Sequence, residues 1–152
     1  MVFNRQKKIA VDEQALTAFL ERILKELKLE GIEVAVAFVT DAEIGKWNKK
    51  YRGKSGPTDV LSFPALGRRN LAHFKKKSTK GKSGAEAGYL GDIAIAPETA
   101  KRNTAENGHT IGNELRVLML HGVLHLMGYD HESDSGQMNR IERQLRRRLG
   151  IA

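Results

Sequence analysis

Apolar residues recur every three or four positions in several parts of the chain, and this period predicts amphipathic helices. It is clearest between Leu16 and Leu27, directly after Asp12, a residue type that favours the N-cap of a helix. In other segments, residues that favour helix caps indicate where further helices begin, and the prediction is about five helices in all. We expect these helices at residues 12–27, 41–51, 98–106, 110–127 and 138–149.

Three further segments have the patterns of strands. Residues 32–39 form a largely apolar run, which is typical of a strand that is covered on both faces. A short strand is expected before Pro64, in a segment bounded by prolines, and another at residues 88–96, with Ile93 and Ile95 on one face. This order of helices and strands predicts one α+β domain over residues 1–152, with a small mixed β-sheet covered by helices.

Positive charge is concentrated in two parts of the chain. The net charge of +8 arises from 26 lysines and arginines against 18 acidic residues. One basic cluster lies in the Gly-, Ser- and Lys-rich segment 65–87, which has no clear period and is expected to form a mobile surface loop. The other consists of arginines on the last helix. Clustered charge favours a polyanion such as nucleic acid as the partner, although a solvated helix face has the same pattern.

Composition narrows the cellular setting. The chain has no cysteine, which excludes disulfides and thiolate metal sites and fits the reducing cytoplasm. It has no apolar stretch of the length that a membrane span or signal peptide needs. We therefore expect a cytoplasmic protein without a membrane partner. Because only 6% of the residues are aromatic, few exposed rings are expected for base stacking, and nucleic-acid contact should be mainly electrostatic.

The strongest candidate for chemistry is the segment from His121 to His131, which has histidines at positions i, i+4 and i+10. On a helix, His121 and His125 lie one above the other on the same face. Gly128 stands where a left-handed glycine ends a helix, and the turn can bring His131 back as a third ligand. Three imidazoles leave a tetrahedral Zn²⁺ one open position for water, as in catalytic zinc sites, although Ni²⁺, Cu²⁺ and Fe²⁺ also bind imidazole.

Three blocks of the chain together resemble the YbeY-type endoribonucleases, the bacterial rRNA maturation factors. They are the histidine segment 121–131, residues 48–64 with the run Pro57-Thr58-Asp59-Val60-Leu61-Ser62-Phe63-Pro64, and Leu90-Gly91-Asp92-Ile93. The resemblance spans essentially the whole chain and implies a single-strand-specific, metal-dependent endoribonuclease. It also implies work on ribosomal RNA, chiefly at the 3′ end of the small-subunit RNA, and in ribosome quality control. RNA and the small ribosomal subunit are then the expected partners, and DNA is not. The segment 65–87 is longer and more basic than is usual in this family.

By position, the resemblance makes the three histidines the zinc ligands and Arg52 the arginine implicated in catalysis. We expect Arg52 to neutralise charge on the phosphoryl oxygens, because guanidinium matches phosphate geometry. Asp92 and Asp59 are the carboxylates of the motif blocks that can act as general base, and either can orient a histidine instead. The candidate catalytic residues are thus Arg52, His121 and Asp92. Attack by bound water and attack by the 2′-hydroxyl of the RNA both remain open.

Two other interpretations compete with an RNA-cleaving metalloenzyme. The histidine spacing predicts a zincin-like metal helix and also occurs in zinc proteases with the pattern H-E-x-x-H-x-x-G-x-x-H. Here Gly122 stands at the position of their catalytic glutamate, so the general base of a metalloprotease or peptidase is missing. The second alternative is a non-catalytic ribosome-binding factor with a structural metal, in which a fourth ligand such as Asp130 closes the site.

Overall fold

A four-stranded mixed sheet forms the middle layer of the structure. The computed structural model describes residues 1–65, 88–130 and 135–151. The strands lie in the order β1-β2-β4-β3, with β1, β2 and β4 parallel and β3 antiparallel to β4. Their bounds are β1 Val2–Asn4, β2 Glu33–Phe38, β3 Val60–Pro64 and β4 Tyr89–Ile95.

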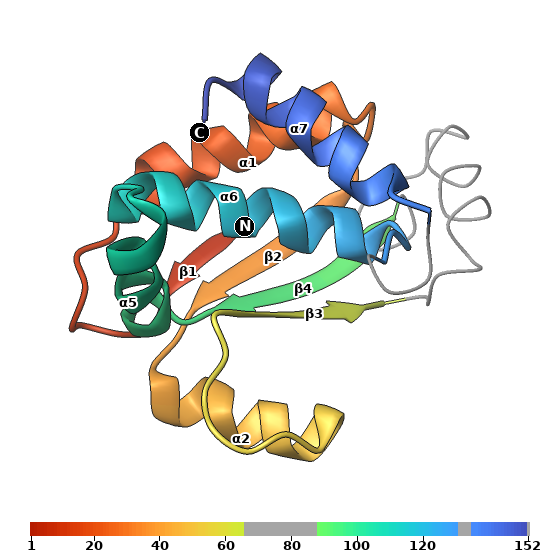
Figure 1. Cartoon of the computed structure of the whole chain (residues 1–152). Coiled ribbons are helices and arrows are strands. Elements are labelled where there is room, and N and C mark those ends of the chain that lie inside the picture. The colour runs from red at the N-terminus through yellow and green to blue at the C-terminus, as the bar shows by residue number, and fades with distance from the viewer. Residues whose placement is uncertain (66–87, 131–134, 152) are drawn as a thin grey trace.

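Helices cover the two faces of this sheet unequally. Figure 1 shows α6 next to one face with α1 and α7 beyond it, whereas α2 lies on the opposite side. The described helices are α1 Glu13–Glu26, α2 Asp41–Arg52, α5 Pro97–Asn107, α6 Ile111–Leu126 and α7 Gln137–Leu149. The predicted α+β class, with a small mixed sheet and about five helices, is therefore confirmed.

Side-chain caps fix the starts of three helices where the sequence places capping residues. The side chain of Asp12 accepts a hydrogen bond from the backbone N–H of Ala15 at 3.0 Å. Thr40 and Thr110 cap α2 and α6 in the same way. Each cap satisfies one of the backbone N–H groups that lack a partner in the first turn, so these starts follow from local chemistry.

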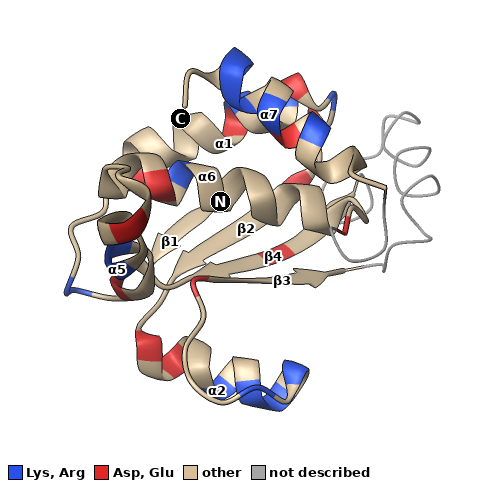
Figure 2. Ribbon diagram, in the orientation of Figure 1, with Lys and Arg blue, Asp and Glu red and all other residues tan. Residues whose placement is uncertain are grey.

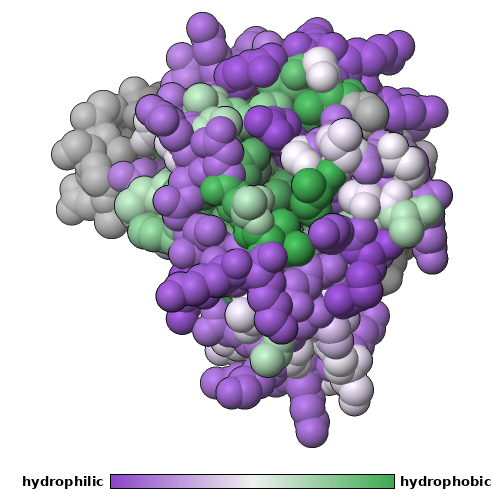
Figure 3. All heavy atoms as spheres, turned by 90° about the vertical axis from the view of Figure 1, so that its left-hand side faces the viewer, coloured by the Kyte–Doolittle hydropathy of each residue, from purple (hydrophilic) through white to green (hydrophobic). Residues whose placement is uncertain are grey.

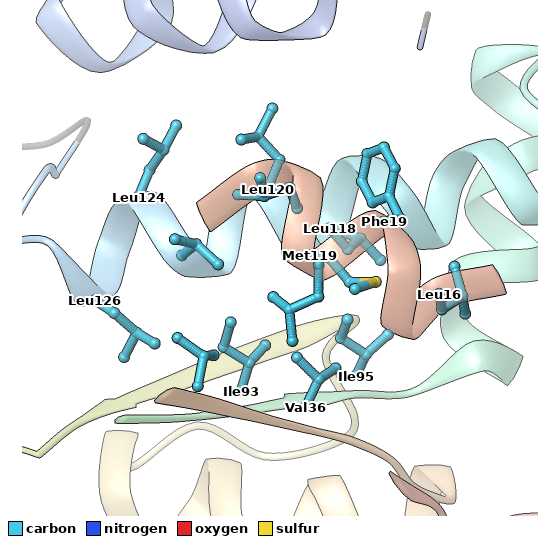
Figure 4. Packing of buried hydrophobic residues seen from close by; sticks show 14 of the residues in the cluster. Leu16, Phe19, Val36, Ile93, Ile95, Leu118, Met119, Leu120, Leu124 and Leu126 are labelled. Atoms are coloured by element: carbon cyan, nitrogen blue, oxygen red, sulfur yellow. The ribbon is translucent and has the colours of Figure 1, made fainter. Parts of the chain in front are cut away.

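Helix α6 is the centre of the hydrophobic core. It is buried around most of its circumference, since it packs against β3 and β4 on one side and against α1, α5 and α7 on the others. In Figure 4, Leu118, Met119 and Leu126 lie among side chains that rise from the strands, such as Ile93 and Val36. A helix that is apolar nearly all round belongs inside a protein, and any polar side chain on it is therefore notable.

The sheet face toward α2 is less well covered than the pattern predicts. In β2, the side chains of Val34, Val36 and Phe38 are buried, but Ala35 and Ala37 on the other face are only half-buried. The prediction that this strand is covered on both faces is thus wrong for the α2 side. Ile44 packs with a small second cluster on this side, so α2 covers one part of the face and leaves the rest open.

Strand β1 and the basic loop mark where the prediction is incomplete. The sequence pattern does not reveal β1, which has three residues and is placed by parallel pairing with β2. The predicted loop at residues 65–87 lies, except for Ala65, outside the described residues.

None of the described helices combines the length and the hydrophobicity that a membrane span requires. On the face that Figure 3 shows, hydrophobic side chains gather in a patch surrounded by hydrophilic ones.

Candidate functional site

Two histidines interrupt the apolar surface of α6 in its last two turns. His121 and His125 are half-buried, and their ring centroids are 4.5 Å apart. Their Nε2 atoms lie 3.0 Å from each other. The i, i+4 spacing thus does what the sequence predicts, because it brings one nitrogen of each imidazole to the same place.

The buried carboxylate of Glu142 on α7 orients the first histidine. Oε1 of Glu142 accepts a hydrogen bond from Nδ1 of His121 at 2.9 Å, and Glu142 is only 9% exposed. Arg146, one turn further along α7, lies 3.3 Å from the other carboxylate oxygen. Since the carboxylate accepts, the hydrogen of the His121 ring sits on Nδ1, and Nε2 carries the lone pair.

Sequence reasoning missed Glu142, although a signal for it exists. Met138, Leu145 and Leu149 form the buried stripe of α7, and Glu142 lies on this stripe, four residues after Met138 and three before Leu145. A glutamate at a core-facing position needs a partner, because burying an unpaired charge is costly. The position of Glu142 among these apolar residues therefore indicates a buried partner for its carboxylate.

The histidine pair suits a metal ion that prefers nitrogen ligands. Two nitrogens bound at 2.0–2.1 Å to one tetrahedral zinc lie about 3.3 Å apart, close to the separation of the two Nε2 atoms. The predicted third ligand, His131, lies outside the described residues. Within the described ranges, no group of three histidine, cysteine or acidic side chains is arranged to hold a metal. The three-histidine ligand set therefore stays a prediction.

A tight turn follows the second histidine, as Gly128 predicts. Gly128 has a φ of +99°. Its N–H donates to the carbonyl of His125 at 2.9 Å, and the N–H of Tyr129 donates to the carbonyl of Leu124 at 3.1 Å. These two bonds are the Schellman arrangement that ends a helix and reverses the chain.

Gly122 faces the sheet at a point of close contact. A Cβ atom added to it would lie 2.9 Å from two carbon atoms of the Ile93 side chain, which is itself almost completely buried. A glutamate side chain at this position would have to enter the space that Ile93 fills in β4. The packing therefore explains why this helix cannot carry the general base of a zinc protease at position 122.

Arg52 lies at the exposed C-terminal end of α2, beyond strand β3. Figure 2 shows positive charge gathered at this end of the helix. Asn48 donates from Nδ2 to the carbonyl of Gly56 at 3.0 Å and so holds the loop after Arg52 against α2. On one face of β3, Ser62 donates to the carbonyl of Gly122 at 3.3 Å. The structure thus places Arg52 and the histidine pair on different sides of β3 and does not bring them into contact.

Neither candidate aspartate reaches the histidines. Asp92 lies on β4 next to Ile93 and therefore faces the α2 side of the sheet, where the hydroxyl of Tyr89 donates to its Oδ1. Burial raises the pKa of the Asp92 carboxyl above its ordinary value. Asp59 accepts a hydrogen bond from Asn103 at 3.2 Å and links the start of β3 to α5. The orienting contact that the sequence analysis considered for these two residues is made by Glu142.

Three aromatic side chains gather beside Arg52. Phe63 on β3 makes edge-to-face contacts with Tyr51 and with Trp47 of α2, at centroid distances of 5.4 and 6.3 Å. Tyr51 is 59% exposed. The low aromatic content predicts few rings for stacking, but the fold collects three of them at one place.

Comparison with known proteins gives a consistent result. A family model described as Endoribonuclease YbeY matches residues 1–150. An endoribonuclease YbeY of Pelotomaculum thermopropionicum is 42% identical, across 99% of this chain and 97% of the relative. One of Koribacter versatilis is 38% identical, across 99% of this chain and 86% of the relative. The solution structure of TM1509 from Thermotoga maritima superposes with a TM-score of 0.62 at 27% identity, covering 98% of this chain and 89% of that one.

Proposed function

The chain belongs to the YbeY family of endoribonucleases, and from this premise we propose that it cleaves single-stranded RNA with the help of a bound metal ion. Membership supports an enzyme that cuts RNA internally. The finer parts of the proposal are a role in ribosomal RNA maturation at the 3′ end of the small-subunit RNA, a role in ribosome quality control, association with the small ribosomal subunit, and action in the cytoplasm.

The observation that carries the metal proposal is the contact between His121 and Glu142. His121 and His125 would hold a Zn²⁺ ion through Nε2, with His131 of the motif as the third ligand. When bound, such an ion supplies a Lewis acid that activates water and offsets negative charge on a phosphate. Glu142 keeps the lone pair of His121 on Nε2 and increases the basicity of this ring, as carboxylates do for histidine ligands generally.

Arg52 is the residue that we assign to the phosphate. It is the last residue of α2, where Lys49 and Lys50 add positive charge, and its side chain makes no hydrogen bond or ion pair with the part of the chain that the structure describes. A guanidinium group binds two phosphate oxygens at once, which favours the more highly charged transition state. An RNA strand that contacts both Arg52 and the histidine pair must pass around β3, because they lie on different sides of this strand.

One set of RNA-cleavage assays tests the proposal. Purified protein with quantified metal receives a single-stranded RNA and the same sequence in a duplex. We expect cleavage of the single strand, loss of cleavage in His121→Ala, and a rate loss on the order of 10²-fold in Arg52→Ala. His109→Ala is the matched control, because His109 also pairs with a buried glutamate, Glu114 at 3.1 Å, but lies at the other end of α6. Equal RNA degradation by the wild type and His121→Ala would show that a contaminant is responsible. Casein cleavage that is lost in His121→Ala would support the protease instead.

A further inference from the structure

A cavity opens on the sheet face toward α2, where the helix leaves the strands uncovered. Its volume is about 530 Å³, within the range of pockets that hold small organic molecules. All four strands contribute to its floor. Ala35, Asp92 and Phe63 stand side by side there, because they are paired in register across β2, β4 and β3.

The walls of the cavity suit a flat aromatic ring. Trp47 and Tyr51 of α2 line it together with Phe63, and Phe3 of β1 lies at its other side with 45% of its surface exposed. Exposed rings at the mouth of an apolar cavity are the usual platform for stacking nucleobases.

The polar groups of the cavity are arranged for a nucleotide. Asp92 presents its carboxylate at the floor, and the Tyr89 hydroxyl engages Oδ1, which leaves Oδ2 without a hydrogen bond to the described residues. The ammonium of Lys50 lies 5.2 Å from the centroid of the Tyr51 ring, and Arg5 is among the residues that line the cavity. An exposed acceptor on the strands, with cations close by, complements a base with N–H donors that is attached to a phosphate.

We propose that this cavity binds one unpaired nucleobase of the RNA substrate, and that Asp92 favours bases with an exocyclic amino group over uracil. The inference rests on the proposed RNA-cleaving function. The amino groups of cytosine, adenine and guanine can donate to a carboxylate, whereas the only ring N–H of uracil is flanked by two carbonyl oxygens that the carboxylate repels. A paired base cannot enter such a cavity, so the site also gives a physical reason for single-strand preference.

Strand β3 connects the cavity to the histidine pair. Phe63 points into the cavity, and the neighbouring Ser62 contacts α6 at Gly122, one residue after His121. An RNA strand that crosses β3 can therefore leave one base in the cavity while its backbone approaches the histidines. In this arrangement Asp92 and Tyr51 are positioning and specificity residues, not catalytic ones.

Trp47 makes the proposal directly measurable, because it is the only tryptophan of the chain and lines the cavity. The full-length protein is titrated with CMP, UMP and ribose 5-phosphate while tryptophan fluorescence is recorded. These ligands contain no phosphodiester between nucleotides, so cleavage does not interfere. We expect saturable quenching by CMP, a Kd for UMP that is roughly tenfold higher, and no quenching by ribose 5-phosphate.

Two variants and a matched control separate the contribution of Asp92 to base selectivity from the contribution of Tyr51 to affinity. Asp92→Asn should bring the Kd values for CMP and UMP together, and Tyr51→Ala should raise both by roughly tenfold. Glu21→Gln removes an exposed carboxylate on α1, on the far side of the sheet, and should change neither value. Thermal unfolding of each variant checks that it is folded; Tyr51 is mostly exposed, so its truncation leaves the core intact.

The outcomes distinguish this inference from the proposed function. If the protein cleaves RNA but no nucleotide changes the fluorescence of Trp47, the nucleobase site is wrong and the endoribonuclease proposal stands. If nucleotides bind as expected but RNA is not cleaved, the nucleobase site stands and the endoribonuclease proposal is wrong. Equal affinity for CMP and UMP in the wild type would refute the selective role of Asp92.

Discussion

At the scale of single residues, the contact between Glu142 and His121 decides which imidazole nitrogen is available to a ligand. A histidine without such a partner exchanges between two tautomers, and either nitrogen can carry the hydrogen. The 2.9 Å contact to a buried carboxylate removes this freedom. It also adds negative charge next to the ring, which strengthens the binding of a cation at Nε2.

Replacing Glu142 by glutamine tests this role. The amide can still accept a hydrogen bond but carries no charge, so we expect the affinity for zinc to fall by about 10- to 100-fold. Competition with a fluorescent chelator measures this affinity. Glu26→Gln is the matched control, because Glu26 pairs with Arg148 of the same helix α7 at 3.6 Å and has no hydrogen bond or ion pair to a histidine of the described residues. Unchanged zinc affinity in Glu142→Gln would mean that the negative charge of Glu142 does not strengthen metal binding at His121.

The residues of the site were predictable only where their spacing is local. His121 and His125 are one helical turn apart, so their approach follows from the sequence. Glu142 reaches the pair from another helix, 21 positions later, and its contact depends on how α7 packs against α6. Asp92 shows the opposite case, because the alternation of side chains along β4 puts this motif residue on the face away from the histidines.

At the scale of elements, the contact between α6 and β4 sets the position of the histidine helix. Gly122 lets the helix backbone come directly onto Ile93, and the space for a Cβ atom is already filled by that side chain. This contact holds the last two turns of α6, with the histidines, at a fixed height over the sheet. The caps, the apolar stripes and the Gly128 turn were predictable, because each depends on neighbours in the sequence. Strand β1 was not, because three residues gain their structure only from pairing with β2.

Alanine substitutions at two helical glycines separate packing from helix propensity. Alanine is intrinsically better than glycine in a helix by about 1 kcal/mol. Gly45→Ala in α2 should gain this amount, since its nearest neighbours lie at an ordinary 3.7 Å. Gly122→Ala should instead lower the free energy of unfolding by about 1 kcal/mol, because overpacking a filled core costs about 1–3 kcal/mol. Urea denaturation measures the change in the free energy of unfolding of both variants. A stabilised Gly122→Ala would mean that the contact between α6 and β4 can accommodate a Cβ atom.

At the scale of the whole molecule, basic side chains surround the route that RNA would take. Figure 2 shows positive charge on α7 and at one end of α2, whose acidic residues lie in its first turn, at the other end. On α7, a groove of about 570 Å³ is lined by four arginines, which are Arg140, Arg143, Arg146 and Arg147. Arg146 neutralises Glu142, so it belongs to the histidine site. Arg143 and Arg147 are exposed and form no ion pair with the described residues, which leaves them available for phosphates.

The salt dependence of RNA binding tests whether these two arginines contact the RNA. Each phosphate that a protein neutralises on a single strand changes the slope of log K against log salt by about 0.7, because a condensed counterion is released. The double substitution Arg143→Gln and Arg147→Gln should therefore flatten this slope by about 1.4. Fluorescence anisotropy with a labelled single-stranded RNA, in the catalytically inactive His121→Ala background, measures binding without cleavage.

A control with two lysine substitutions distinguishes direct contact between the arginines and the RNA from a general attraction by the positive charge of the protein. Lys7→Gln with Lys101→Gln removes the same charge from exposed positions, on the segment after β1 and on α5. If α7 binds RNA, only the arginine pair changes the slope, since counterion release depends on phosphates that are contacted and not on net charge. If both double variants flatten the slope equally, the positive charge acts on the RNA from a distance, and the groove on α7 is not part of its path.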